Sequence, residues 1–344
     1  MSVLSYDEAI QSIVSTAGNY RRGEIRAFDF VHVQRWIEQL QMTDEYKLIF
    51  LREIARLLAG SFISKKLAKD CLKNFFRTIK ENLPGRDIRN VNFIKNQPAG
   101  KSQSDLLILV DNILNKEYGV TTANCGGSNV YLYIDDAVYS GSKFRYDMRD
   151  WLKNVPADLN LITYHLVHHL EGYDYARRHI QEYVSAKGGR FYSWRTYVIP
   201  NRRRNFDPIY IFWPRYFQGN AQVDSYFRVV AQQRESHNVP CHDIFRGTNV
   251  KVLPGFFSSS EAQDIVEQAF LNVGTQIYFT AQNPQRNVRP MGFDSLSTLG
   301  FGSPIITYRN VANNCPLALW YGDPDNYGQN HPLGQWYPLF KRKN

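Results

Sequence analysis

The sequence predicts an α/β fold: a parallel sheet, preceded by a helical region and followed by a mixed region that completes the core. Between about residues 91 and 199, short strand-like runs alternate with helix-like runs across short connections, which is typical of a parallel α/β sheet. Before that stretch, apolar residues recur at helical spacing, and after about residue 220 the periodicity is mixed. We therefore expect three regions, over residues 1–88, 89–220 and 221–344.

The first region is predicted to be helical up to about residue 83. Apolar residues recur every three or four positions, for example at Val33, Trp36, Ile37 and Leu40. Thr43 precedes two acidic residues and is typical of a helix start, whereas Pro84 and Gly85 end the last helix. Such amphipathic stripes usually face the core of a protein rather than a partner.

The middle region contains four strand-like runs, over residues 91–94, 129–134, 159–166 and 191–199. Helix-like runs lie between them, from Ser104 to about Glu117, near 143–153 and near 174–186. In the third region, the best-defined element is a helix over residues 259–271. Ser258 with Glu261 would begin this helix as a capping box, and Gly274 would end it.

Composition and charge narrow the class of protein. With 43% hydrophobic and 21% charged residues, the chain of 344 residues is globular rather than disordered or fibrous. Its longest apolar run, residues 106–110, is far short of the roughly 18–20 residues of a membrane span. The start lacks a secretory signal and the four cysteines lie far apart, so we expect a reduced, cytoplasmic protein without membrane contact. The net charge of +9 favours a polyanionic or phosphorylated partner.

Residues 131–144 (YLYIDDAVYSGSKF) carry the clearest indication of chemistry. An apolar strand ends in two adjacent acids, Asp135 and Asp136, and a turn of small residues leads into a helix. In an open parallel sheet, ligands bind beyond the carboxyl ends of the strands, and a helix N-terminus is suited to a phosphate. We expect the acids to accept hydrogen bonds from ribose hydroxyls, and the turn to hold a 5-phosphate. The residues expected to bind the ribose and its phosphate are Ala137, Ser140, Gly141, Ser142 and Lys143.

Simpler structural interpretations of the acidic pair and of two other groups of residues also fit the sequence. The two acids would also suit a solvated turn that ends in an ordinary helix N-cap. Arginines interleaved with aromatic residues suit single-stranded nucleic acid, or a solvated loop; the candidates are Arg202, Arg203 and Arg204. Three histidines in or just after the strand at 159–166 are expected at a partly buried edge: His165, His168 and His169.

The acidic run resembles the ribose-phosphate signature of type I phosphoribosyltransferases, in which two acids precede a small-residue turn. Asp135, Asp136, Ser140 and Gly141 match this signature in register, and Lys143 stands where that family usually has Thr or Ser. The loop over residues 97–102 resembles the pyrophosphate loop of the same family. That resemblance assigns the pyrophosphate to Gly100, Lys101 and Ser102.

Longer strings resemble the phosphoribosyltransferase-like (PRTase-CE) domain of bacterial conflict systems. They are IDDAVYSG (134–141), RPMGF (289–293), LGFGS (299–303), TYRNVANNCPLALW (307–320) and WYPLF (336–340). The resemblance implies a type I phosphoribosyltransferase-like, Rossmann-like fold with an N-terminal helical region and a mixed C-terminal region. It also implies a toxic effector of anti-phage defence, with relatives that act beside retron reverse transcriptases and their RNA and DNA.

By the same resemblance, phosphoribosyl pyrophosphate (PRPP) or a related ribose-5-phosphate nucleotide is the expected ligand. Asp135 and Asp136 would hold the ribose hydroxyls and stabilise positive charge at C1, while Mg²⁺ neutralises the pyrophosphate. Type I enzymes carry a long hood loop, whereas only residues 118–129 precede the acidic strand here, which favours hydrolysis or mere binding. The alternative is a non-catalytic module that binds a nucleotide or nucleic acid and docks to a partner such as a retron complex.

Overall fold

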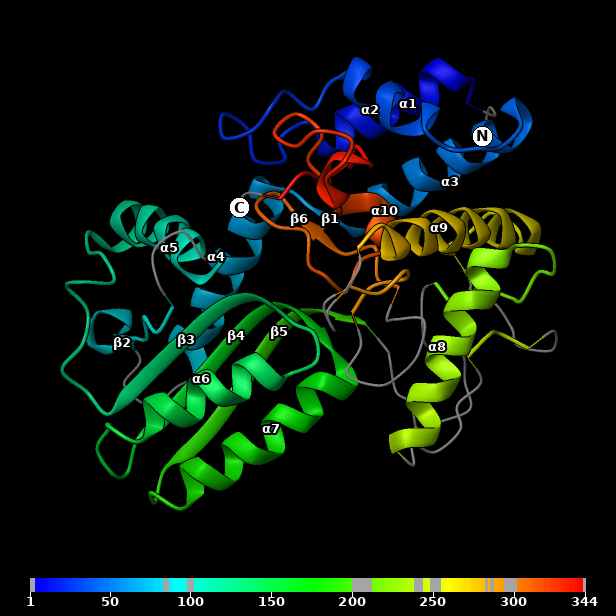
Figure 1. Ribbon diagram of the computed structural model, residues 1–344. Coiled ribbons are helices and arrows are strands. Elements are labelled where there is room, and N and C mark those ends of the chain that lie inside the picture. The colour runs from blue at the N-terminus through cyan, green and yellow to red at the C-terminus, as the bar shows by residue number, and fades with distance from the viewer. Residues whose placement is uncertain are drawn as a thin grey trace. The chain divides into compact units, whose positions relative to one another are not determined.

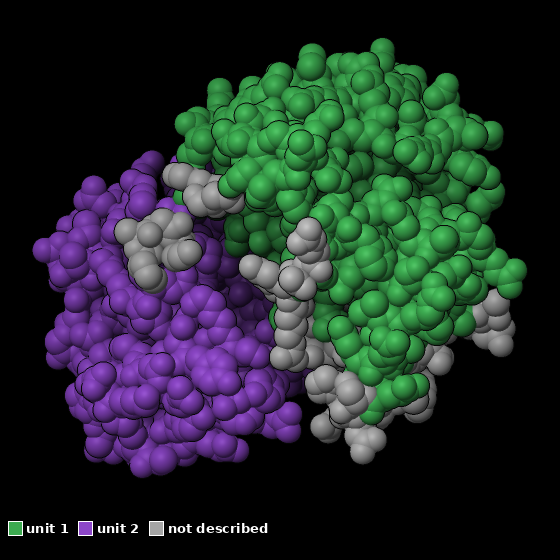
Figure 2. All heavy atoms as spheres, in the orientation of Figure 1, with its two compact units in different colours: residues 1–64, 203–344 green, residues 65–202 purple. Residues whose placement is uncertain are grey.

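Parallel strands and helices alternate through the middle of the chain, as the sequence predicts (Figure 1). The computed structural model describes residues 4–82, 87–97, 102–199, 212–237, 244–247, 255–281, 284, 288–293 and 302–342. The chain divides into two units: residues 65–202 form one, and residues 1–64 with 203–344 form the other (Figure 2). The predicted helical region thus contributes to both units, and the C-terminal region shares a unit with the first helices.

The unit of residues 65–202 is built on four parallel strands in the order β2-β3-β4-β5. The strands are β2 (Asn92–Phe93), β3 (Val130–Val138), β4 (Asn160–His169) and β5 (Arg190–Ile199). The helices are α4 (Lys65–Asn82), α5 (Ser102–Tyr118), α6 (Ser142–Leu152) and α7 (Leu170–Ser185), with a short 3₁₀ turn, η1 (Ile88–Asn90). Each of β2, β3 and β4 therefore feeds a helix that returns the chain to the next parallel strand, which is the connection that parallel pairing requires.

Helices pack on both faces of this sheet. On one face, Phe144 and Met148 of α6 and Ile180 of α7 form a buried cluster with strand residues that include Tyr133 and Leu161. On the other face, α4 places the ring of Phe75 against Tyr164 of β4, with ring centroids 4.2 Å apart. Because both faces are covered, β4 is buried along nearly its whole length, as is typical of parallel strands.

Two of the predicted strands, at 129–134 and 159–166, extend further than their apolar runs indicate. The predicted strand at 129–134 is β3, which continues through the two acids to Val138, and β4 continues to His169. Parallel pairing carries both strands on, since Ala137 pairs with Val167 and Val138 with His168. Asp135 and Asp136 therefore lie inside a strand, which corrects the expectation that they follow its end. Backbone pairing with a neighbour determined the end of the strand, and the pattern of apolar residues does not show that pairing.

The second unit joins the first helices to the C-terminal region. Its helices are α1 (Tyr6–Ala17), α2 (Phe30–Glu38), α3 (Asp44–Ser61), α8 (Ala221–His237), α9 (Ser260–Thr280) and α10 (Leu317–Trp320), with a 3₁₀ turn, η2 (Pro332–Gly334). Two short strands, β1 (Phe62–Ile63) and β6 (Ile306–Thr307), pair in parallel. The indole N–H of Trp36 donates to the Ala318 carbonyl (2.9 Å), which ties the N-terminal helices to the C-terminal segment.

Helix α9 corrects the predicted boundaries of the helix at 259–271. Its N-cap is Ser259, whose hydroxyl accepts the Ala262 N–H at 3.0 Å, rather than Ser258. The helix runs past Gly274 to Thr280, because this glycine serves a close approach and not a helix end: a Cβ there would lie 2.6 Å from the Pro290 Cα. Neither α9 nor any other described helix combines the length and the apolar character that crossing a membrane needs.

Candidate functional site

The carboxylate of Asp135 is the centre of a polar cluster on β3. The residue is 7% exposed, and four groups donate hydrogen bonds to its two oxygens. Oδ1 accepts from the Ser102 hydroxyl at 3.1 Å and from the Asp136 N–H at 2.9 Å. Oδ2 accepts from the Gln97 amide at 2.9 Å and from the Tyr133 hydroxyl at 2.8 Å. In the described part of the chain no cation forms an ion pair with Asp135, and it is these hydrogen bonds that compensate the burial of its carboxylate there.

Burial sets the ionisation of this cluster. It raises the pKa of Asp135 above its ordinary range, because the charged form loses water, while the four hydrogen bonds act in the opposite direction. Burial, together with the neighbouring Asp135 carboxylate, also raises the pKa of Tyr133 well above its ordinary range. Tyr133 therefore remains a neutral phenol that donates to the carboxylate. The Asp135 carboxylate is therefore a hydrogen-bond acceptor that its donors hold in one orientation.

The predicted pyrophosphate loop begins and ends at Asp135. Gln97 precedes residues 98–101 and Ser102 follows them, and both side chains reach the same carboxylate. The buried amide of Gln103 holds the start of the loop in place, since its oxygen accepts the N–H groups of Asn96 (3.3 Å) and Gln97 (3.1 Å). The structure thus brings Ser102 of the predicted loop to the acidic strand, whereas Gly100 and Lys101 lie outside the described residues. The roles of Gln97 and Gln103 were not predicted; the only signal was their place on either side of the loop.

Asp136 has different surroundings from Asp135. Successive residues of a strand point to opposite faces of the sheet, so the two carboxyl groups do not lie side by side on one face. Asp136 is 8% exposed, and its Oδ1 accepts the N–H of Ala137 at 2.8 Å. The pair therefore presents two separate acceptors, one on each side of β3.

The bend after β3 is fixed by contact between backbones. Gly141 has a φ of +75°, and a Cβ on it would lie 1.9 Å from the Gly172 carbonyl oxygen in the first turn of α7. A Cβ on Gly172 would in turn lie 1.7 Å from the carbonyl oxygen of Tyr139. Only glycine at both positions allows the bend to lie against α7. The sequence analysis assigns Gly141 to a phosphate-binding turn. The structure shows that packing of the bend against α7 also requires a glycine at this position.

The start of α6 keeps free hydrogen-bonding groups. Gly141 is its N-cap and supplies no side chain to the first-turn N–H groups. Among the described residues, neither the Ser140 nor the Ser142 hydroxyl has a hydrogen-bond partner. Lys143 lies on the outer side of the helix, with 68% of its side chain exposed, and pairs with Asp147 one turn on. The bend thus offers N–H and hydroxyl donors, while the Lys143 ammonium is already engaged.

Three histidines adjoin the cluster, and they are buried on an inner strand instead of at the expected partly buried edge. His165 pairs in register with Asp135, and its Nδ1 lies 3.1 Å from Nε2 of His168. Burial lowers the pKa of His165 well below its ordinary range and that of His168 and His169 to about 3. All three are therefore neutral near pH 7. The edge position was wrong because β5 adds a further strand beyond β4.

The third group of predicted residues cannot be placed. The candidates for nucleic-acid contact, Arg202, Arg203 and Arg204, lie outside the described residues.

Comparison with protein families gives a match that covers nearly the whole chain: a family model named PRTase-CE matches residues 33–342. The chain belongs to the PRTase-CE family. Searches of curated proteins and of solved structures found no match.

The PRTase-CE match confirms the predicted family and agrees with the predicted α/β fold. It spans both units, so α3, most of α2 and the C-terminal strings belong to the family domain together with the sheet, whereas α1 precedes the matched region. The chain is therefore phosphoribosyltransferase-like along most of its length. PRTase-CE membership also places the Asp135 cluster, the bend at 139–142 and Ser102 inside the matched region.

The described residues do not form a ready-made metal centre. They contain no group of three or more His, Cys, Asp or Glu side chains that would hold an ion. Mg²⁺ commonly binds through one or two carboxylates, with phosphate and water oxygens completing the shell. The residues here therefore fit an ion that arrives with a pyrophosphate ligand better than one that resides in the protein.

Proposed function

We propose that this PRTase-CE protein binds PRPP or a related ribose-5-phosphate nucleotide at the acidic strand, and that it transfers or hydrolyses the ligand at ribose C1. One observation carries the proposal: in a phosphoribosyltransferase-like chain, both ends of the loop after β2 converge on the Asp135 carboxylate. A loop held at the acidic strand is suited to a ligand that carries ribose hydroxyls at one end and a pyrophosphate at the other.

The bend before α6 is the proposed seat of the 5-phosphate. Its support is the pair of hydroxyls on Ser140 and Ser142, which have no partner among the described residues, together with the N–H groups that Gly141 leaves without a side-chain cap. Donors of this kind stabilise an anion at a helix N-terminus, and the helix dipole adds to the attraction. Lys143 is proposed to add attraction at longer range, since Asp147 already takes its ammonium.

The two acids are proposed to accept hydrogen bonds from the ribose. For Asp135, a ribose hydroxyl would have to replace one present donor, and the Ser102 hydroxyl is the easier to displace because it rotates freely. When the bond from C1 to the pyrophosphate oxygen breaks, the electron pair leaves with the pyrophosphate and C1 becomes positive. A nearby carboxylate stabilises that charge until water or an acceptor nitrogen attacks. Bound Mg²⁺ would neutralise the departing pyrophosphate.

We further propose the biological setting that the family resemblance implies: a toxic effector of anti-phage defence in the cytoplasm, which assembles with a retron reverse transcriptase and its nucleic acid.

The alternative function, a non-catalytic nucleotide- or nucleic-acid-binding module, is favoured by one observation. The Asp135 carboxylate already accepts four hydrogen bonds, which suits a structural anchor. Binding without turnover would support the module.

Calorimetric titration with PRPP and MgCl₂ tests the site. Ser142→Asp should weaken PRPP binding at least tenfold, since it places a negative charge at the proposed phosphate seat. The same change should not unfold α6, because an acid in the first turn of a helix is favourable. Asp136→Asn should also weaken binding, whereas Asp150→Asn, a matched change on the exposed side of α6, should not.

Release of pyrophosphate, followed by chromatography, separates the two functions. Turnover of PRPP or of a nucleotide by the wild-type protein, lost in Asp136→Asn, supports the enzyme. No PRPP binding by the wild-type protein, or equal binding by the wild-type, Ser142→Asp and Asp136→Asn proteins, contradicts the proposed site.

A further inference from the structure

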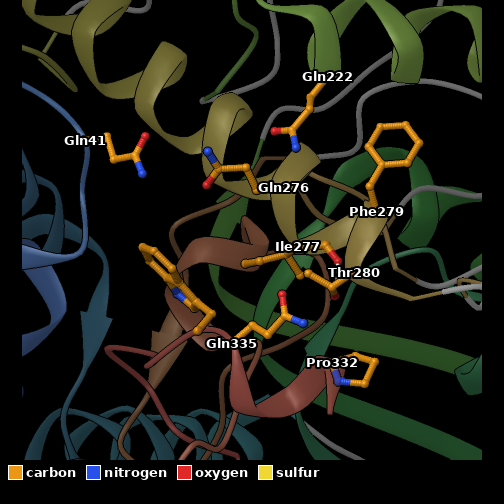
Figure 3. A pocket seen from close by; sticks show the side chains of 9 residues that line it. Gln41, Gln222, Gln276, Ile277, Phe279, Thr280, Pro332 and Gln335 are labelled. Carbon is orange, nitrogen blue, oxygen red and sulfur yellow. Dashed lines mark hydrogen bonds between the residues drawn. The ribbon is translucent and has the colours of Figure 1, made fainter. Parts of the chain in front are cut away.

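A polar groove follows helix α9 in the unit formed by residues 1–64 and 203–344. Two adjoining cavities of about 520 and 630 Å³ make up this groove, and both are lined by Gln41 and Gln276. Figure 3 shows the first cavity, with the amides of Gln41, Gln222, Gln276 and Gln335 around it. We call it the amide groove, after the eight side chains that line it: Gln39, Gln41, Asn220, Gln222, Gln268, Asn272, Gln276 and Gln335.

Most of these amides are available to a ligand. Within the described residues, the side chains of five of the eight make no hydrogen bond: Gln41, Gln222, Gln268, Gln276 and Gln335. Gln39 donates to the Tyr337 carbonyl at 2.9 Å, and Asn220 donates to Asn272. Asn272 uses only its oxygen, which accepts from Asn220 at 3.0 Å. Each free glutamine offers one carbonyl acceptor and two N–H donors, so the groove presents both kinds of group.

The spacing of the amides on α9 matches an extended peptide. Gln268, Asn272 and Gln276 lie four residues apart, so they share one face of the helix at steps of about 6 Å. An extended chain rises about 3.3 Å per residue, so peptide groups of the same orientation recur about every 6.6 Å. Over two steps the mismatch along the helix axis is about 1 Å, while the side chains turn by about 80° around the axis, so the bound chain would cross the helix obliquely. Each side-chain amide can therefore donate to a peptide carbonyl and accept from a peptide N–H.

The charges and aromatic residues of the groove narrow the ligand further. Among the described residues, no lysine or arginine lines either cavity, so this lining offers none of the phosphate contacts that dominate nucleic-acid binding. The two acids in the lining are Glu261 and Asp264, and Asp264 is paired with Arg246 at 2.6 Å. Glu261 has no ion pair or hydrogen bond among the described side chains, so it favours a basic residue at that end.

Two aromatic side chains supply apolar contact. Tyr46 and Phe279, with exposed fractions of 46% and 41%, line the second and the first cavity respectively. In an extended peptide, alternate side chains point to one side, so those facing the groove would contact these rings.

We propose that the amide groove binds an extended segment of a partner protein, with a lysine or arginine near Glu261. Gln268, Asn272 and Gln276 hydrogen-bond the backbone of that segment, while Tyr46 and Phe279 contact its side chains. The mode of binding is recognition of an extended backbone by side-chain amides, with weak dependence on sequence except at the basic residue. This proposal goes beyond the phosphoribose site, since its residues belong to the other unit.

The test uses the full chain and a phage library of random dodecapeptides. Enriched peptides are synthesised with fluorescein and titrated by fluorescence polarisation. The double variant Gln268→Leu, Gln276→Leu should weaken binding at least tenfold, because it removes up to four hydrogen bonds. Gln11→Leu, the same change at an exposed position of α1, is the matched control and should bind as the wild type does.

Two further measurements test the backbone hydrogen bonds and the basic residue of the peptide separately. Replacing alternate peptide bonds of the bound peptide by esters removes N–H donors and should weaken binding to the wild type, with little further effect in the double variant. Glu261→Lys should weaken binding of peptides with a basic end. The proposal is overturned if no peptide is enriched, if the double variant binds the peptides as the wild type does, or if the groove binds a dodecamer of thymidylate in place of a peptide.

Discussion

Asp135 allows one detailed prediction, because its four hydrogen bonds include both rigid and adaptable donors. The Asp136 N–H and the Ser102 hydroxyl share Oδ1, whereas the Gln97 amide and the Tyr133 hydroxyl share Oδ2. In Asp135→Asn, the new NH₂ group can occupy the Oδ2 position, since the Gln97 amide can flip and the Tyr133 hydroxyl can accept. In Asp135→Ala, no acceptor remains for any of the four donors.

The two variants should therefore differ widely in stability. An unsatisfied buried donor costs about 1–3 kcal/mol, and water can reach some of the four, so Asp135→Ala should lose about 3–5 kcal/mol in the free energy of unfolding. Asp135→Asn keeps its partners and loses a buried charge, so it should change the free energy of unfolding by about 1 kcal/mol or less. Urea denaturation, followed by circular dichroism, measures both values.

The pH dependence has a definite sign. Burial raises the pKa of Asp135 in the folded state above that in the unfolded state. The folded wild type therefore binds more protons, and its stability falls as pH rises from the unfolded pKa through the folded pKa. Asn has no such titration, so the stability of Asp135→Asn relative to wild type should improve as the pH rises. A relative stability that is constant or falls with pH, or an Asn variant as unstable as the Ala variant, would refute this account.

Three further predictions concern stability and can be measured by urea denaturation. Gly172→Ala should cost at least about 3 kcal/mol, because its Cβ would lie 1.7 Å from a carbonyl oxygen, whereas Gly60→Ala, in a helix with nothing within 4 Å, should stabilise by up to about 1 kcal/mol. Arg246→Met should cost about 3–5 kcal/mol by leaving Glu267 buried and unpaired, and adding Glu267→Leu should recover much of that loss. Burial lowers the pKa of His168 to about 3, so stability should fall as pH drops below about 6.5, and His168→Gln should reduce that slope by about 1.4 kcal/mol per pH unit between about pH 6 and 4. Equal slopes in the two proteins would show that His168 does not titrate as inferred.

The sequence indicates part of the site because local chemistry is visible in it. The apolar run before Asp135 identifies a strand, and the small residues at 140–142 identify the bend that begins a helix. The partners of Asp135 are not visible in this way. Gln97 and Tyr133 are ordinary polar and aromatic residues in the sequence, and only their distances to one carboxylate give them a role.

Residues close together in the chain were enough to predict the alternation of strands and helices, the helix start at Thr43, and the acidic strand with its bend. Only the packed structure shows how far β3 extends, why α9 passes through Gly274, and that Gln97 and Ser102 donate to Asp135. Those features depend on contacts between residues distant in sequence, and such contacts form only when strands pair and helices pack.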